Sequence, residues 1–408
     1  MSEPKKVAVL KGGGSLERTV SLRSGARAQS ALRQLGHEVV AIDAGPDLVA
    51  QLLEAGPDAA FVALHGSDGE DGTVQGLLEA IGIPYTGSGP AACMRCTDKA
   101  LAKYLMREAG IPTPEFAAFK ESAIKDLGVA AALSGLERSI GFPMVAKPAS
   151  QGSALGVKFA RSAQELPGAI VGALSYDRKV VIERYIKGRD LAVSVLDSVP
   201  DAPAASPPAR GSVGEMEFPP TPLPVVEAIP REEEFYNYES RYEIGMTTFV
   251  CPAELPGGIA ARAQELALET YKLLGCHGVA RVDLMLEEQT GELAVLETNV
   301  VPGLTETSLL PLAADAAEIW LDRLPVEPSL VSDFGASWPD LAVGGGEDFE
   351  LVAAVPEGAV PALLESWPAD LAALTVVGRL LEGATVVALH HESGGVAPRP
   401  RTTSRHFA

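Results

Sequence analysis

Short apolar segments alternate with longer, helix-like segments through the first third of the chain. The apolar segments, which fit β-strands, cover residues 7–10, 37–42 and 59–64. The longer segments, which fit helices, cover residues 17–35, 48–54 and 73–81. Strands separated by helices predict a parallel sheet with helices on both faces, and therefore an α/β domain.

Glycine-rich turns follow the first and third of these strands, at residues 11–15 and 65–72. Ligands bind to open α/β sheets at the carboxyl ends of the strands, where both turns lie. The two turns therefore predict a ligand site in the N-terminal part of the chain.

The pattern changes near residue 97, where a helix at residues 98–109 ends in a glycine and two prolines. Apolar segments then come in pairs without a crossover helix, which predicts an α+β module. The expected strand pairs are residues 142–147 with 156–160, and residues 180–185 with 190–196. Residues 201–224 are rich in Pro, Ala and Ser, and we expect a solvated surface insertion there.

Regular secondary structure is expected again after this insertion. The expected elements are a helix at residues 257–274, strands at 279–286 and 293–297, and a helix at 308–321. Near residue 324 the composition changes again, and a short αβ segment leads to a polar tail. In this segment we expect strands at residues 349–355, 374–380 and 385–389, and a helix at 361–367.

Composition excludes several classes of function. Lys and Arg total 33 against 54 Asp and Glu, a net charge of −21, whereas nucleic-acid binding needs a basic face. No apolar run approaches the roughly 20 residues that span a bilayer, and we see no signal peptide, so we expect a cytoplasmic protein without a membrane partner. Of the four cysteines, Cys93 and Cys96 form a CxxC pair, which we interpret as ordinary reduced thiols.

One loop has the composition of a phosphate-binding loop. Lys147 ends a strand, and residues 148–157 are rich in Gly, Ser and Ala, whose backbone N–H groups suit phosphate oxygens. The Gly-Lys-Thr/Ser spacing of a Walker A loop is missing. From the residues alone, phosphate binding and a simple hairpin turn both stay open.

Two later strands carry charged side chains on one face. Arg281 and Asp283 are two residues apart, as are Glu297 and Asn299, and side chains on a strand alternate with a period of two. Two carboxylates and an amide oxygen are the hard ligands that Mg²⁺ takes, with phosphates and water completing the site. The alternative is a pair of surface salt bridges.

Together these segments resemble the ATP-grasp enzymes, and the glycine-rich turns narrow the resemblance to the D-alanine–D-alanine ligase family. It covers about residues 5–319, and its most specific motifs are residues 12–21, 65–76 and 83–89. The implied fold class is α/β, with an N-terminal parallel-sheet (preATP-grasp) domain, a two-part α+β ATP-grasp domain and a small C-terminal αβ appendage. The implied bounds are residues 1–96 for the first domain, 97–189 and 190–320 for the two parts of the second, and 321–408 for the appendage.

The resemblance also implies a reaction. The family joins two molecules of D-alanine in an ATP-dependent reaction that passes through an acyl phosphate, and the dipeptide enters peptidoglycan synthesis, cell wall biogenesis and the control of cell shape. Two Mg²⁺ or Mn²⁺ ions are implied, as are a homodimer and a cytoplasmic location.

Site residues follow from the resemblance position by position. The implied ATP-binding residues are Lys99, Lys147, Ser153, Glu183, Ile186 and Asp190. The implied metal ligands are Asp283, Glu297 and Asn299. The implied catalytic residues are Glu17, Ser153, Tyr242, Arg281 and Gly303. The implied substrate-binding residues are Glu17, His65, Arg281, Gly303 and Ser308.

The resemblance gives each of these groups a task. Lys99 and Lys147 hold phosphates, whereas Glu183 and the backbone of Ile186 meet adenine and Asp190 meets the ribose. Glu17 holds the ammonium of the first D-alanine, close to His65. Arg281 and the N–H of Gly303 stabilise the oxyanion, and Ser308 holds the second carboxylate.

Tyr242 bears on substrate choice. It lies in residues 235–242, which are similar to the mobile closing loop of the family, although aromatic packing in an ordinary loop is the alternative. D-alanine–D-lactate ligases typically have His or Phe there, so Tyr favours the dipeptide. A D-lactate or other carboxylate–amine ligase and a catalytically impaired nucleotide-binding fusion protein stay open.

The chain departs from the family pattern at several positions. Ser153-Ala154 stands where two serines are common, Val300-Val301 where a Thr is common, and the Pro-rich insertion is long. After about residue 320 the chain instead resembles the last part of thiamine-monophosphate kinase, over about 85 residues. The ATP ligands and most metal ligands of that kinase family lie in its N-terminal half, which has no counterpart here, so this fragment is expected to lack kinase activity.

Overall fold

The computed structural model describes residues 4–126, 129–197, 220–230, 246–305, 307–314, 316–320, 378–380 and 386–390. Contacts between residues divide the chain into two units, Met1–Ala313 and Ala314–Ala408. Within the described residues, every helix is too short or too polar to cross a bilayer.

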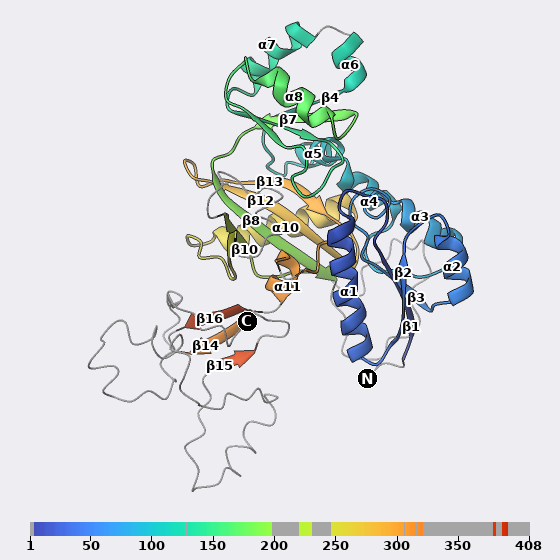
Figure 1. Ribbon diagram of the computed structural model, residues 1–408. Helices are drawn as coiled ribbons and strands as arrows, with labels where there is room; N and C mark the ends of the chain where they lie inside the picture. The colour runs from blue at the N-terminus through green and yellow to red at the C-terminus, as the bar shows by residue number, and fades with distance from the viewer. Residues whose placement is uncertain are drawn as a thin grey trace, which may run out of the picture. The chain divides into compact units, whose positions relative to one another are not determined.

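The first unit begins with a three-stranded parallel sheet in the order β2-β1-β3 (Figure 1). Its strands are β1 (Lys6–Lys11), β2 (Glu38–Asp43) and β3 (Ala59–Val62). Its helices are α1 (Arg18–Gln34), α2 (Leu48–Ala55) and α3 (Thr73–Ala80). Residues 7–10 of β1 are all buried, because the central strand of a parallel sheet is covered on both faces. The predicted alternation of strands and helices is confirmed.

Two helices lead out of this sheet. They are α4 (Pro90–Thr97) and α5 (Lys99–Glu108), and Asp98 lies between them. The Asp98 carboxylate accepts a hydrogen bond of 3.1 Å from the backbone N–H of Leu101 and so caps α5. This cap sets the start of the helix that carries Lys99.

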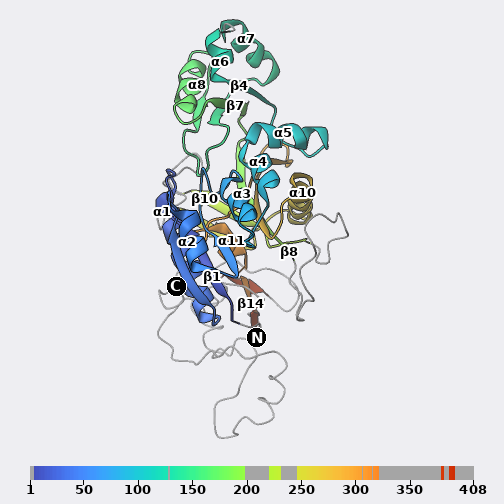
Figure 2. The same ribbon diagram turned by 90° about the vertical axis from the view of Figure 1, so that its right-hand side faces the viewer.

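A four-stranded antiparallel sheet follows, in the order β4-β7-β5-β6. Its strands are β4 (Phe116–Lys120), β5 (Met144–Pro148), β6 (Lys158–Ala160) and β7 (Lys179–Arg184). Its helices are α6 (Glu121–Asp126), α7 (Val129–Ser139) and α8 (Leu166–Leu174). Figure 2 shows these helices gathered around β4 and β7, and α8 contacts β5, β6 and β7. The predicted pair at 142–147 and 156–160 is confirmed as β5 and β6.

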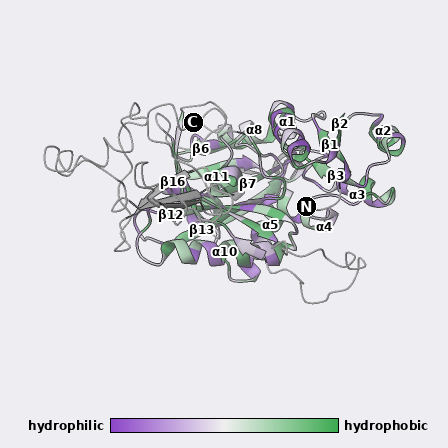
Figure 3. Ribbon diagram, turned by 90° about the horizontal axis from the view of Figure 1, so that it is seen from below, coloured by the Kyte–Doolittle hydropathy of each residue, from purple (hydrophilic) through white to green (hydrophobic). Residues whose placement is uncertain are grey.

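A larger sheet has six strands, in the order β11-β10-β8-β12-β13, with β9 also paired to β8. The strands are β8 (Gly188–Asp197), β9 (Pro220–Pro222), β10 (Val226–Pro230), β11 (Thr247–Val250), β12 (Val279–Glu287) and β13 (Leu293–Asn299). Helix α10 (Ile259–Leu274) packs on β8, β12 and β13, and it carries both hydrophobic and hydrophilic residues in Figure 3. Its buried residues include Leu266, Tyr271 and Leu274, which join the core of this sheet.

One sequence prediction about this region is wrong, and another is wrong at one end. Residues 180–185 and 190–196 were expected to pair, but β7 pairs with β4 and β5 whereas β8 pairs with β10 and β12 in the other sheet. The chain passes from one sheet to the other between Arg184 and Gly188, and an apolar pattern does not identify the partner of a strand. The expected insertion at 201–224 also includes Pro220–Pro222, which forms β9; residues 198–219 lie outside the described residues.

The predicted helix at 308–321 is wrong in its second half. Helix α11 covers only Leu309–Ala314, and β14 covers Ala316–Trp320. In the second unit β14 pairs with β15 (Gly378–Leu380) antiparallel and with β16 (Val386–His390) in parallel. These two strands agree with the apolar segments at 374–380 and 385–389. The strand expected at 349–355 and the helix expected at 361–367 lie outside the described residues.

Candidate active site

Glu17 lies in the turn between β1 and α1, and its carboxylate is buried at 4% exposure. Ser153, from the loop after β5, donates a hydrogen bond to Glu17 Oε1. Glu17 Oε2 has no hydrogen-bond partner among the described residues. A Cβ at Gly66 or at Gly152 would lie 2.9 Å from Oε2, so a larger residue at either position would displace the carboxylate.

Burial raises the pKa of Glu17 above its ordinary value, and the nearby charge of Glu70 raises it further. The hydrogen bond from Ser153 and the electrostatic interactions with His65 and Lys99 act in the opposite direction. A buried carboxylate with one unpartnered oxygen is costly. A cationic ligand at Oε2 would remove that cost.

The Ser153 loop holds its side chain in an uncommon backbone conformation. Ser153 and Ala154 have φ angles of 52° and 57°, in the left-handed region that non-glycine residues rarely adopt. Such strain gathers at ligand sites, where the surrounding structure holds it in place.

His65 connects the N-terminal sheet to the segment that follows β13. Its Nδ1 lies 3.2 Å from Glu70 Oε1, and its Nε2 lies 3.1 Å from Ser24 Oγ. Ser24 Oγ in turn accepts a hydrogen bond of 3.1 Å from the N–H of Leu304. His65 is therefore linked through Ser24, by two hydrogen bonds, to the segment that carries Gly303.

Gly303 and Ser308 lie within a hydrogen-bonded turn. The N–H of Thr305 donates to Ser308 Oγ at 2.9 Å, and the N–H of Ser308 donates to the Thr305 carbonyl at 3.1 Å. A Cβ at Gly303 would lie 2.7 Å from Ser308 Oγ. The turn brings together the two residues that were expected to contact the substrate.

A second cluster is built around Glu183 at the end of β7. Lys147 Nζ lies 2.6 Å from Glu183 Oε1, and Lys103 Nζ lies 2.9 Å from Glu183 Oε2. Burial by itself would raise the pKa of Glu183, but the two ammonium groups outweigh it and lower the pKa below its usual value. The carboxylate is therefore ionised in the interior.

Lys99 reaches toward the loop after β5 and toward β13. Its Nζ donates to the Gln151 carbonyl at 2.7 Å and lies 3.4 Å from Glu297 Oε2. Ile186 is buried in the connection between β7 and β8, whereas Asp190 lies on β8 opposite Met285. Lys99, Lys147, Glu183 and Ile186 thus come from neighbouring segments, and Asp190 belongs to the larger sheet.

The side chains expected to bind metal lie across two paired strands. Asp283 on β12 stands opposite Glu297 on β13, and Arg281 stands opposite Asn299. Opposite residues of an antiparallel pair point to the same face, so all four side chains share one surface, as predicted. Arg281 donates two hydrogen bonds to Asp283, at 2.6 and 2.8 Å, and Asn299 Nδ2 donates one at 3.1 Å.

Comparison with known proteins identifies the family. The profile described as D-ala D-ala ligase C-terminus matches residues 105–326, and that described as D-ala D-ala ligase N-terminus matches residues 47–88. The D-alanine--D-alanine ligase of Syntrophotalea carbinolica is 40% identical over 322 residues, which cover 79% of this chain and 94% of that protein. The chain belongs to the D-alanine–D-alanine ligase family.

Solved structures of this family have the same fold. The D-alanine--D-alanine ligase of Bacillus anthracis matches with a TM-score of 0.61 at 34% identity, over 76% of this chain and 91% of that one. The same enzyme complexed with ATP matches with a TM-score of 0.59 at 32% identity, over the same shares of the two chains. The predicted fold class is therefore confirmed. The C-terminal resemblance to a kinase stays a prediction.

The donor set fits the metal that this family implies. Two carboxylates and an amide oxygen on one face are hard ligands of the kind that Mg²⁺ or Mn²⁺ takes. No group of three or more His, Cys, Asp or Glu side chains suited to a metal occurs in the part of the chain that the structure describes. The proposed ligands Asp283, Glu297 and Asn299 do not form such a group, because one of the three is an asparagine.

Sequence reasoning about the ligase site missed Lys103, Glu70 and Ser24. Lys103 is four residues after Lys99 on the same helix, a spacing that places both on one face, and this signal was available. Glu70 lies within the predicted turn at 65–72, but only the fold shows that its side chain reaches His65. Ser24 lies inside α1 and carried no signal. Tyr242 lies outside the described residues.

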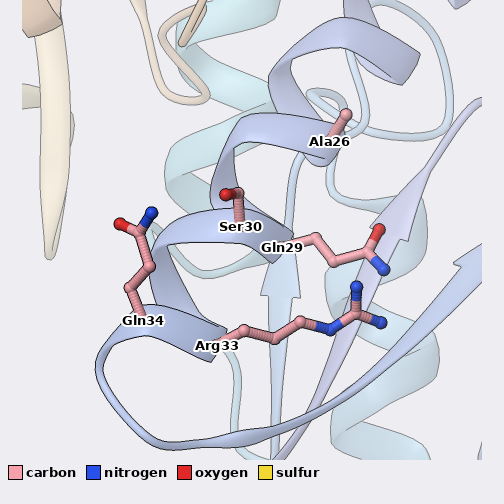
Figure 4. A pocket seen from close by; sticks show the side chains of 5 residues that line it. All are labelled: Ala26, Gln29, Ser30, Arg33 and Gln34. Carbon is pink, nitrogen blue, oxygen red and sulfur yellow. The ribbon is translucent and has the colours of Figure 1, made fainter.

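Two further features lie apart from the ligase site. Cys276 is 180 positions from Cys96 in the sequence, but its Sγ lies 3.7 Å from that of Cys96, and both thiols are free and buried. An open hollow of about 410 Å³ lies along α1, and its lining residues in Figure 4 are Ala26, Gln29, Ser30, Arg33 and Gln34. It contains none of the expected site residues.

Proposed function

We propose that this chain is an ATP-dependent ligase that joins two molecules of D-alanine into D-alanyl-D-alanine for peptidoglycan synthesis. The observation that carries the proposal is the buried Glu17 carboxylate, one oxygen of which is bound by Ser153 while the other has no described partner. It brings a buried carboxylate from the turn after β1 against the loop that follows β5, so an ammonium group and a phosphate would be held close together. That is the arrangement an amino acid and a nucleotide need in order to react together.

The proposed reaction has two steps. In the first, a carboxylate oxygen of one D-alanine attacks the γ-phosphorus of ATP, and ADP leaves. In the second, the neutral amine of another D-alanine attacks the acyl carbon, inorganic phosphate leaves with the bonding electrons, and the proton that the nitrogen releases passes to that phosphate. Both steps need the reactants to be held in line and kept from water.

The nucleotide is expected to lie between the four-stranded sheet and β13. Lys99 and Lys147 would hold its phosphates as point charges, and Ser153 would contribute a hydroxyl. Glu183 and the backbone of Ile186 would meet adenine, and Asp190 would meet the ribose. The support from the structure is that Lys99, Lys147 and Glu183 come from three separate elements and are all buried.

The first D-alanine would place its ammonium at Glu17 Oε2, near His65. The second would place its carboxylate at the turn that holds Ser308, with Gly303 beside it. Arg281 and the N–H of Gly303 would stabilise the negative charge of the tetrahedral intermediate. A guanidinium has five N–H donors, and two of those of Arg281 donate to Asp283.

Asp283, Glu297 and Asn299 would hold the divalent ions. When bound, such ions neutralise charge on the phosphate oxygens during phosphoryl transfer. The carboxylates of Asp283 and Glu297 are at present engaged by Arg281 and Lys99, so positive charge already faces both of them. Exchange of one cation for another at these oxygens keeps the local charge nearly balanced.

The product assay that tests the proposal uses ATP, Mg²⁺ and D-alanine, and it measures dipeptide and phosphate together. We expect one dipeptide for each phosphate released, with L-alanine as an inactive control. Preference for D-lactate as second substrate would support the alternative ligase instead. Nucleotide binding without turnover would support the impaired fusion protein.

Two further features belong to the proposal. We expect a homodimer, which light scattering of the purified protein would test. We also propose that residues after about 320 are a remnant similar to the last part of thiamine-monophosphate kinase, without kinase activity. Phosphorylation of thiamine monophosphate by the full chain would overturn that second point.

A further inference from the structure

Lys103 is a buried cation for which the reaction above provides no role. It lies on α5, its side chain has 0% exposure, and the ring of Phe116 lies 5.6 Å from its Nζ. Its Nζ makes two polar contacts, one with Glu183 Oε2 at 2.9 Å and one with Thr113 Oγ1 at 2.7 Å. A fully buried lysine is rare unless a specific partner retains it.

The contacts of Lys103 extend to the strand that carries the metal-ligand candidates. Thr113 Oγ1 donates a hydrogen bond of 2.8 Å to the carbonyl of Val295, on β13. Lys103 therefore joins α5 to Glu183 on β7 directly and to β13 through Thr113. The Lys103 ammonium is therefore held by contacts on two sides.

Glu183 is shared between two lysines with different freedom to move. Lys147 lies at the end of β5, directly before the loop that is proposed to hold phosphates, and it is 6% exposed. If Lys147 turns toward a phosphate, its bond of 2.6 Å to Glu183 Oε1 lengthens or breaks. A buried carboxylate that loses its only cation is strongly destabilised.

We propose that Lys103 is a positioning residue that keeps Glu183 neutralised and fixed while Lys147 engages the nucleotide phosphates. This inference rests on the proposed function. Because Lys103 stays with Glu183, Lys147 can leave it without creating an unpaired buried charge. Without Lys103, Glu183 would hold Lys147 as its only counter-ion and compete with the phosphates for it.

The first test compares nucleotide affinities in the whole protein. Lys103→Met removes the charge at similar side-chain length, and Thr113→Val is the matched control because it alters the same cluster without touching the carboxylate. Calorimetry with Mg²⁺ and a non-hydrolysable ATP analogue should show roughly tenfold or greater weakening for Lys103→Met and little change for Thr113→Val. Adenosine, which lacks phosphates, should bind both variants nearly as well as the wild type.

A merely structural role predicts a different result. General loosening of the site would weaken adenosine and the ATP analogue equally, and it would raise the KM for D-alanine as well. Our inference predicts a higher KM for ATP with the KM for D-alanine nearly unchanged. Equal loss for both nucleoside ligands, or no loss for either, would overturn it.

A double-mutant cycle removes the Glu183 carboxylate, which would otherwise compete with the phosphates for Lys147. In a Glu183→Gln background the carboxylate no longer holds Lys147, so adding Lys103→Met should change the affinity for the ATP analogue by less than about twofold. A loss as large as in the wild-type background would contradict the inference. The double variant also buries no unpaired carboxylate, so it remains informative if Lys103→Met alone folds poorly.

The pH dependence supplies a readout that needs no variant. Burial lowers the pKa of Lys103 to about 8, although Glu183 opposes that shift; Lys147 on β5 and Glu297 on β13 also act on it. Affinity for the ATP analogue should therefore fall as the pH rises through about 8 in the wild type, and this fall should be absent in Lys103→Met. A parallel decline in both proteins would count against Lys103.

The outcomes separate this inference from the proposed function. If the wild type makes no dipeptide and binds no ATP, the proposed function fails first. If the wild type does both and Lys103→Met matches it in affinity and in KM for ATP, only the role of Lys103 is wrong.

Discussion

Arg281 donates two hydrogen bonds to Asp283, at 2.6 and 2.8 Å, across a face of β12 that the two residues share. Both side chains are buried, so this bidentate pair is much stronger than an exposed ion pair. Asp283 stands opposite Glu297 on β13, which in turn lies 3.4 Å from Lys99. Each proposed metal-binding carboxylate thus has a cation beside it.

Glu297→Gln should reduce turnover by about 100-fold or more without unfolding the protein. The change removes one negative charge from the proposed metal site and keeps the shape of the side chain. Steady-state rates across a range of Mg²⁺ concentrations measure it, with circular dichroism as the control for folding. A near-normal kcat in the variant would show that Glu297 binds no metal needed for the reaction.

Glu17→Gln should abolish dipeptide synthesis and raise the free energy of unfolding at pH 7 by about 1 kcal/mol. Because burial raises the pKa of Glu17, the folded state binds the proton more tightly than the unfolded state. Stability from this group is then greatest below pH 4.5 and is lost as the pH rises through the folded pKa. Urea unfolding should therefore show the gain at pH 7 and a smaller one near pH 4.5. Equal gains at both values would contradict this assignment.

Lys103 should make stability rise with pH in the alkaline range. Its pKa is lowered from 10.5 to about 8, so between these values the unfolded chain binds more protons than the folded one. The free energy of unfolding then rises by up to about 1.4 kcal/mol per pH unit from this group, and its contribution is lost as the pH falls through about 8. The free energy of unfolding of the wild type, relative to that of Lys103→Met, should rise from pH 8.5 to pH 9.5, which lies inside that window. A constant difference would mean that Lys103 does not titrate there.

Removal of residues 325–408 should leave the affinities for ATP and D-alanine within a few-fold of the full chain. Every candidate site residue that the structure describes lies in the unit Met1–Ala313. Calorimetry and the dipeptide assay on the truncated protein provide the measurement. A truncated protein that folds but makes no dipeptide would assign the C-terminal residues to the catalytic unit.

The sequence by itself determined the class of fold and the faces of the strands. Alternation of apolar segments with helix-like ones predicts the parallel sheet of β1, β2 and β3, because each pattern depends on neighbouring residues only. The period of two on a strand places Arg281 with Asp283, and Glu297 with Asn299, before any partner strand is known. The family motifs then assign residues to tasks by their order along the chain.

Only the tertiary structure decided which distant segments meet. A strand pattern specifies a face but no partner, so the separation of β7 and β8 into two sheets was not predictable from apolar residues. The same holds for Lys103 with Glu183, which are 80 positions apart, and for Cys96 with Cys276. Burial also depends on the tertiary structure. The lowered pKa of Lys103 and the unpartnered oxygen of Glu17 both arise because the whole fold excludes solvent from these side chains.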